Sequence, residues 1–135
     1  MMKMSDAAVK LCERIGEYLN QAEIFLNEGL RPYACKSLYD AFAVSVTLIV
    51  GEDEEFVKSH SNIMGVALEK IRGDKDMLQK LVIVKALFLN FYFDLMSSEE
   101  IKACIPAIKD IIRYMLLKSG IDEKYWPEKL REKVL

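Results

Sequence analysis

The chain contains one histidine, His60, in the segment "KSHSN" that follows an acidic run. An imidazole at the start of a helix could bind a ligand or transfer a proton. Its ring could equally bond a neighbouring carbonyl or carboxylate in a purely structural role. Nucleophilic triads and zinc sites combine a histidine with partners at defined spacing, and no such pattern surrounds His60. We therefore treat His60 as a candidate binding residue and assign no catalytic residue.

Two pairs of polar residues at helical spacing are the other candidates for chemistry. Asn90 and Asp94 interrupt the apolar stretch "LVIVKALFLNFYFDLM" and are four positions apart, so they share one helix face. They could form a local side-chain pair, fix the register of a dimer interface, or provide the polar floor of a ligand pocket. Lys36 and Asp40 have the same spacing, which predicts an ion pair, and they are included as candidate binding residues.

Metal, cofactor and nucleic-acid sites are not predicted. The three cysteines, Cys12, Cys35 and Cys104, are too widely spaced for a zinc site and too few for a disulfide framework. They indicate reduced, buried thiols in a cytoplasmic protein. The net charge is −2 and the chain has no glycine-rich phosphate loop, so nucleic acid is an unlikely partner and no cofactor is expected.

Helices must position these residues, because apolar residues recur at helical spacing along nearly the whole chain. Serine caps and glycine stops mark the ends, and Ser97 with Glu100 predicts a capping box. The expected helices run from Ser5 or Asp6 to Gly29, Pro32 to Gly51, Ser59 or Ser61 to Gly73, Asp74 or Asp76 to Met96, and Ser98 to Lys118. The pattern predicts an all-α, up-and-down bundle of four to five helices. We expect one domain over residues 1–135, with a core at about 5–119 and a C-terminal tail at 120–135.

Two of these helices, over residues 32–51 and 74–96, carry apolar residues around most of their circumference. The apolar stretch at 81–96 is too short for a membrane span and contains Lys85 besides Asn90 and Asp94, so no membrane is expected. A helix that is apolar all round must be covered all round. A small bundle can hardly cover two of them, which predicts a homodimer that buries the surplus surface.

Three segments resemble the HEPN superfamily. "YLNQAEIFLNEGLRPYACKSLYDAF" resembles the first helical hairpin of HEPN domains, and "SHSNIMGV" looks like the short histidine-led segment that follows. "ALFLNFYFDLMSSEEI" is similar to the "NFY" signature of the archaeal PaREP group, a HEPN-like branch. The resemblance covers about Gly16 to Leu117. It implies an all-α bundle that forms a homodimer with a polar groove near the interface.

Many HEPN proteins are ribonucleases in which four to six residues separate an arginine from a following histidine. For His60 that arginine would fall at Asp53, Glu54 or Glu55, which are all acidic. Acidic side chains repel a phosphate instead of binding it, so this departure argues against nuclease activity.

The milder functions of the family remain as expectations. Asn90 and Tyr92 match the "NFY" positions and His60 matches the histidine-led segment, whereas Phe88 stands where the family pattern has a polar histidine. The resemblance implies a non-catalytic homodimeric binding module, related to nucleotides or paired with a nucleotidyltransferase. The alternatives are a degenerate ribonuclease or nucleotide-modifying enzyme that uses His60, and a helical-repeat-like protein–protein adaptor.

Overall fold

The protein is an all-α bundle arranged around one apolar helix. A computed structural model describes residues 4–50 and 60–131, apart from the side chains of residues 60 and 61. Its helices are α1 (Asp6–Asn27), α2 (Arg31–Val50), α3 (His60–Lys70), α4 (Lys75–Phe93), α5 (Ser98–Lys118), a 3₁₀ turn (Glu123–Tyr125) and α6 (Glu128–Arg131). The predicted fold class is confirmed.

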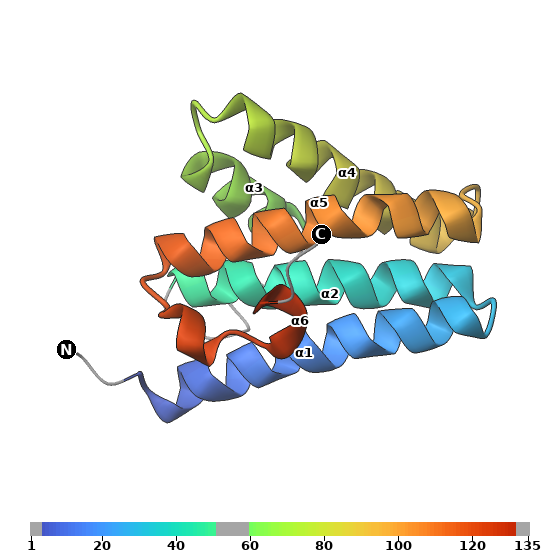
Figure 1. The fold of residues 1–135 in the computed structure, drawn as a ribbon. Helices are drawn as coiled ribbons and strands as arrows, with labels where there is room; N and C mark the ends of the chain where they lie inside the picture. Colours follow the sequence, from blue (N-terminus) through green and yellow to red (C-terminus); the bar gives the residue numbers. More distant parts are fainter. Residues whose placement is uncertain (1–3, 51–59, 132–135) are drawn as a thin grey trace.

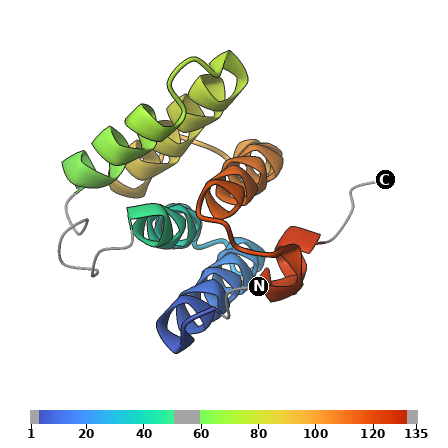
Figure 2. The same cartoon turned by 90° about the vertical axis from the view of Figure 1, so that its left-hand side faces the viewer.

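The helices form three layers (Figures 1 and 2). α2 and α5 lie side by side in the middle layer, and α1 packs on one side of them. α3 and α4 form an antiparallel pair on the opposite side, where α4 contacts both α2 and α5. α2 therefore has neighbours in every layer.

α1 is amphipathic, as its sequence predicts. Its buried residues recur at alternating spacings of three and four, which places them on one stripe facing α2: Cys12, Ile15, Leu19, Ala22 and Leu26. The Ser5 side chain caps the helix by accepting a hydrogen bond from the Ala8 N–H at 3.1 Å. Gly29 has a φ of +76°, the left-handed conformation that lets the chain turn directly into α2.

α2 corrects one expectation drawn from the sequence. Most of its apolar perimeter is covered inside a single subunit, because α1, α4 and α5 pack around it and α3 contacts it as well. Ala34, Cys35, Leu38, Ala41, Phe42, Val44 and Val46 are all buried. The buried hydroxyl of Ser45 donates to the Phe42 carbonyl at 2.6 Å, so this polar group is satisfied within the helix. A single subunit thus covers most of α2, which the sequence pattern did not lead us to expect of a small bundle, whereas Val82, Leu89 and Phe93 of α4 remain exposed.

α5 and the tail complete the bundle. The predicted capping box is present: Ser97 Oγ accepts from the Glu100 N–H at 3.1 Å, and the Glu100 carboxylate accepts from the Ser97 N–H at 2.9 Å. α5 is continuous through Pro106. After Gly120 the chain folds back, and the buried Trp126 donates its indole N–H to the Ile121 carbonyl at 3.2 Å. The tail therefore contributes to the core.

α2 also has the length and apolar composition of a membrane-crossing helix, the only such helix among residues 4–50 and 60–131. In the bundle, 61% of that stretch is buried by other helices. A core helix meets the same criteria as a membrane span, and the packing of α2 identifies it as a core helix here.

Candidate functional site

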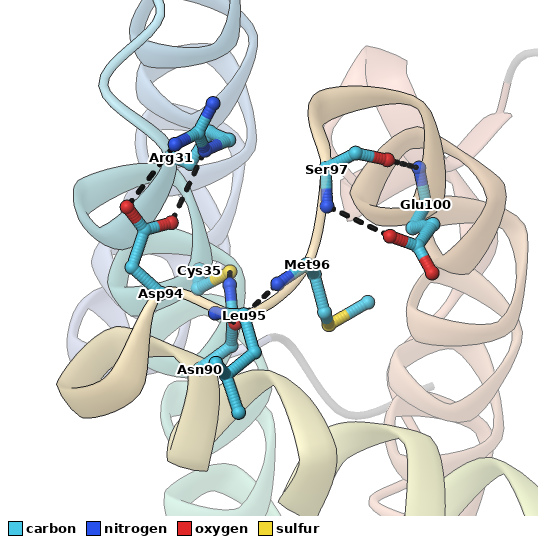
Figure 3. A network of polar contacts seen from close by, with 8 residues as sticks. All are labelled: Arg31, Cys35, Asn90, Asp94, Leu95, Met96, Ser97 and Glu100. Carbon is cyan, nitrogen blue, oxygen red and sulfur yellow. Dashed lines mark hydrogen bonds and ion pairs between the residues drawn. The ribbon is translucent and has the colours of Figure 1, made fainter.

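The candidate residues Asn90 and Asp94 lie at one end of the bundle, where the turn between α1 and α2 meets the turn between α4 and α5 (Figure 3). Their side chains do not bond to each other, although the Asp94 backbone N–H donates to the Asn90 backbone carbonyl at 2.8 Å. Asn90 is buried, and its amide donates to Cys35 Sγ at 3.3 Å. Its carbonyl oxygen accepts from the backbone N–H groups of Leu95 at 2.6 Å and Met96 at 2.8 Å. Both polar atoms of the Asn90 side chain thus hold the α4–α5 connection against α2.

Asp94 ends α4 in a left-handed backbone conformation, with φ +47° and ψ +52°. Asp and Asn adopt this conformation more readily than most residues. Its carboxylate accepts two hydrogen bonds from the Arg31 guanidinium, at 3.1 and 3.2 Å, so the pair is bidentate (Figure 3). These hydrogen bonds and the nearby positive charge lower the pKa of Asp94. Arg31 begins α2, so the ion pair joins the same two turns as Asn90.

The Asp94 carboxylate should make stability depend on pH. Its pKa is lower in the folded than in the unfolded chain, so its contribution is full above the ordinary value of 3.8 and disappears as pH falls through the lowered pKa. We expect Asp94→Asn to reduce the free energy of unfolding at neutral pH. At pH values below the lowered pKa of Asp94, the variant and the unmodified chain should have the same free energy of unfolding. Urea unfolding at several pH values measures this difference. In an Arg31→Gln background the difference should vanish at every pH; a persisting difference contradicts the assignment to this pair.

The other candidate residues are not part of this network. Lys36 Nζ donates to both oxygens of Asp40, at 2.6 and 2.8 Å, which confirms the predicted ion pair along α2. The Tyr92 side chain is exposed, and its ring packs edge-on against Phe88 and Phe91 at centroid distances of 5.4 and 4.9 Å. His60 is the first residue of α3, but its side chain lies outside the described part of the structure, so its binding role stays a prediction.

An exposed apolar face runs along α4. We call it the α4 stripe: Leu78, Val82, Ala86, Leu89 and Phe93. Steps of three and four residues place these side chains on one face, opposite the buried Leu81, Val84 and Leu87. With a rise of 1.5 Å per residue, the α4 stripe is about 22 Å long. Val82 is 63% exposed and Phe93 66% exposed, so most of the surface of these side chains does not pack against the bundle.

Charges flank the α4 stripe without crossing it. Lys85 lies near the middle of α4, but its ammonium sits over the Phe88 ring, 5.3 Å from the ring centroid. Phe88 is half-buried and packs at 4.9 Å from the Tyr39 ring of α2, so Lys85 leans toward its own bundle. Lys80 is likewise held, by Asp76 at 2.7 Å and Asp110 of α5 at 3.2 Å. The stripe therefore presents an apolar surface of the kind that proteins bury against another protein.

The turn between α3 and α4 adds a cavity at one end of the α4 stripe. It has a volume of about 360 Å³ and is lined by Leu68, Ile71 and Leu78, with Arg72 and Lys75 among its polar residues. Leu78 belongs both to this cavity and to the α4 stripe. In the part of the chain that the structure describes, no group of three or more His, Cys, Asp or Glu side chains is placed to hold a metal ion.

Reasoning from the sequence alone missed four features of these sites. Arg31 and Cys35 were not singled out, since their bonds to Asp94 and Asn90 span 63 and 55 positions and leave no local pattern. Leu78 and Ala86 were not grouped with Val82, Leu89 and Phe93. Their three-and-four spacing was a usable signal, because it separates an outer set from the inner set of α4.

Comparison of the chain with models of known protein families, with curated proteins and with solved structures finds no match.

Proposed function

We propose that this chain is a non-catalytic binding module of HEPN type that works as a homodimer, with the α4 stripe as its self-association surface. The exposure of the α4 stripe carries this proposal. α2 shows that this sequence does bury an apolar perimeter where neighbouring helices are available. On α4, four large apolar side chains of the stripe remain exposed: Leu78, Val82, Leu89 and Phe93. Burial of such side chains yields about 25 cal/mol for each Å² removed from water, which favours association.

A twofold homodimer is the simplest assembly that covers this surface. The same stripe on two copies forms a closed interface and leaves no part of the stripe exposed for association with further copies. The resemblance to HEPN domains also implies a homodimer and adds one partner class, the small nucleotidyltransferases. The acidic residues at positions 53–55 argue against the ribonuclease chemistry of that superfamily.

Replacing Leu89 with glutamate tests the proposal. A carboxylate in the middle of an apolar interface would have to be buried without a partner, which costs several kcal/mol. We expect the unmodified chain to show twice its monomer mass of 15.5 kDa by light scattering, and Leu89→Glu to show the monomer mass. Helical content by circular dichroism should be the same for both, since Leu89 is on the open face of α4.

Ile24→Glu is the matched control. Ile24 is an exposed apolar residue on α1, which lies on the opposite side of the middle layer from α4, so this variant should remain a dimer. If the unmodified chain is a monomer, or if both variants dissociate equally, the α4 stripe is not the self-association surface.

A protein–protein adaptor is the second candidate, favoured by the same exposed stripe. An amphipathic helix of another protein could lie along α4 in place of a second copy. The two functions differ in one result: an adaptor is a monomer when pure, and binds its partner in a fixed ratio that Leu89→Glu abolishes and Ile24→Glu preserves.

A further inference from the structure

The two ends of the α4 stripe differ in shape. At the start of α4, Leu78 borders the cavity between α3 and α4, with Leu68 and Ile71 as its other apolar residues. At the end of α4, Phe93 projects from the surface with 66% of its area exposed. One end is hollow and the other carries a protruding aromatic ring. The Phe93 ring of each copy can lie against the cavity of the other only if the two α4 helices run in opposite directions.

Building on the homodimer proposed above, we propose that the two α4 helices pair antiparallel about a twofold axis near Ala86, and that Phe93 of each copy fills the α3–α4 cavity of the other. The cavity is thus a docking site for a second copy of this chain. Each docking site is incomplete until the partner supplies its aromatic ring.

The spacing of the α4 stripe is symmetric about its middle. Leu78 and Phe93 lie equally far from the midpoint between Lys85 and Ala86, and so do Val82 and Leu89. A twofold interface requires this property: where one residue meets a second, the second meets the first. In the antiparallel pair Leu78 faces the partner's Phe93 and Val82 faces the partner's Leu89. Ala86 lies at the crossing point, where a small side chain allows the two helices to approach closely.

The cavity has the size and lining that an aromatic side chain needs. Cavities of roughly 300–1,000 Å³ hold drug-sized ligands, so one of about 360 Å³ accommodates a phenyl ring with room for its neighbours. Ile71 is buried at the base of the α3–α4 turn, whereas Leu68 and Leu78 are exposed and would be covered by the ring. Aromatic side chains that fill such pockets usually dominate the energy of an interface.

Charge also favours the antiparallel arrangement. Arg72 and Lys75 line the cavity together with one acidic residue, Asp74, whose carboxylate is occupied in capping α4 through the Met77 N–H at 3.1 Å. In the antiparallel pair the Arg72 and Lys75 side chains of the two copies lie at opposite ends of the interface. A parallel pair would instead bring Arg72 and Lys75 of both copies together, and like charges repel. Antiparallel packing also places the positive N-terminal end of each helix dipole beside the negative C-terminal end of the other.

Cysteine cross-linking tests the register directly. A disulfide forms only where two Cβ atoms come within about 3.5–4.5 Å, so it reports which residues face each other. Leu78→Cys and Phe93→Cys are each made in a Cys104→Ser background, because Cys12 and Cys35 are buried and Cys104 is partly exposed. The two variants are mixed, allowed to exchange subunits, and oxidised mildly. We expect covalent dimers from the mixture and almost none from either variant alone.

The opposite pattern overturns the proposal: covalent dimers from each single variant show that α4 pairs in parallel. Light scattering of the same samples separates this failure from that of the homodimer itself. A dimer without mixed cross-links contradicts only the antiparallel register, whereas a monomeric unmodified chain contradicts both. Either cysteine substitution could dissociate the dimer, which light scattering would show as the monomer mass. In that case the mixture of Val82→Cys and Leu89→Cys tests the same register closer to the axis and should cross-link in the same way.

Discussion

Replacing Asn90 with alanine is expected to destabilise the fold by about 2–4 kcal/mol, because it leaves two backbone N–H groups without their acceptor and each such loss costs roughly 1–3 kcal/mol. The Asn90 carbonyl oxygen accepts from Leu95 at 2.6 Å and Met96 at 2.8 Å, at the point where α4 ends and α5 has not yet begun. The variant also removes the contact between the Asn90 amide and Cys35 Sγ. Urea unfolding followed by circular dichroism measures the loss.

Hydrogen exchange gives Asn90→Ala a second, local readout. The backbone amides of Leu95 and Met96 should exchange markedly faster in the variant, while amides in the middle of α1 stay protected. Asn20→Ala is the matched control, since Asn20 is exposed in α1 and alanine there changes stability by only a few tenths of a kcal/mol. An Asn90→Ala chain that unfolds within about 0.5 kcal/mol of the unmodified one would show that the α4–α5 connection does not depend on this side chain.

The second large effect is expected at Phe42, in the middle of α2. Phe42→Ala should destabilise the fold by about 3–5 kcal/mol, the usual cost of emptying the site of a buried phenylalanine. The ring is completely buried, and α2 is surrounded by α1, α4 and α5, so no single neighbour can move to close the cavity. Urea unfolding at a fixed protein concentration measures the change.

Phe42→Leu separates packing from any special role of the ring. Leucine keeps most of the buried volume, so this variant should lose clearly less stability than Phe42→Ala. The two substitutions test the central position of α2: if Phe42→Ala costs less than about 1 kcal/mol, the site can collapse and α2 is not the enclosed helix of the fold.

Much of the fold could be predicted from the sequence, because helix ends are local events. Ser5, Gly29 and the box of Ser97 and Glu100 carry recognisable cap chemistry, and all three act in the structure as expected. Several residues near the end of α2 are β-branched and still helical, since tertiary packing outweighs a small loss of helix propensity: Val44, Val46, Thr47, Ile49 and Val50.

The position of each helix in the bundle could not be predicted in the same way. Residues 32–51 and 74–96 have similar apolar patterns, and periodicity shows how many faces are apolar but not what covers them. α2 is the enclosed helix and α4 the open one. Small residues in α2, such as Ala34, Ser37 and Ala41, let helices approach from several sides and were the available signal.

The polar sites depend on long-range contacts and were predicted only in part. The sequence singled out Asn90 and Asp94 as polar residues in an apolar helix. In the structure Asn90 forms a buried hydrogen bond and Asp94 forms a bidentate ion pair. Their partners lie in distant segments that no local pattern connects. By contrast, Lys36 and Asp40 are four positions apart on one helix, and their ion pair was predictable.

The central claim is that a second copy of the chain covers the α4 stripe. Sedimentation equilibrium of the unmodified chain, over a dilution series from hundreds of micromolar to low micromolar, tests it most directly. The account predicts a species of twice 15.5 kDa that persists into the micromolar range. A species of 15.5 kDa at every concentration contradicts it, and leaves the exposed Val82, Leu89 and Phe93 to a different partner.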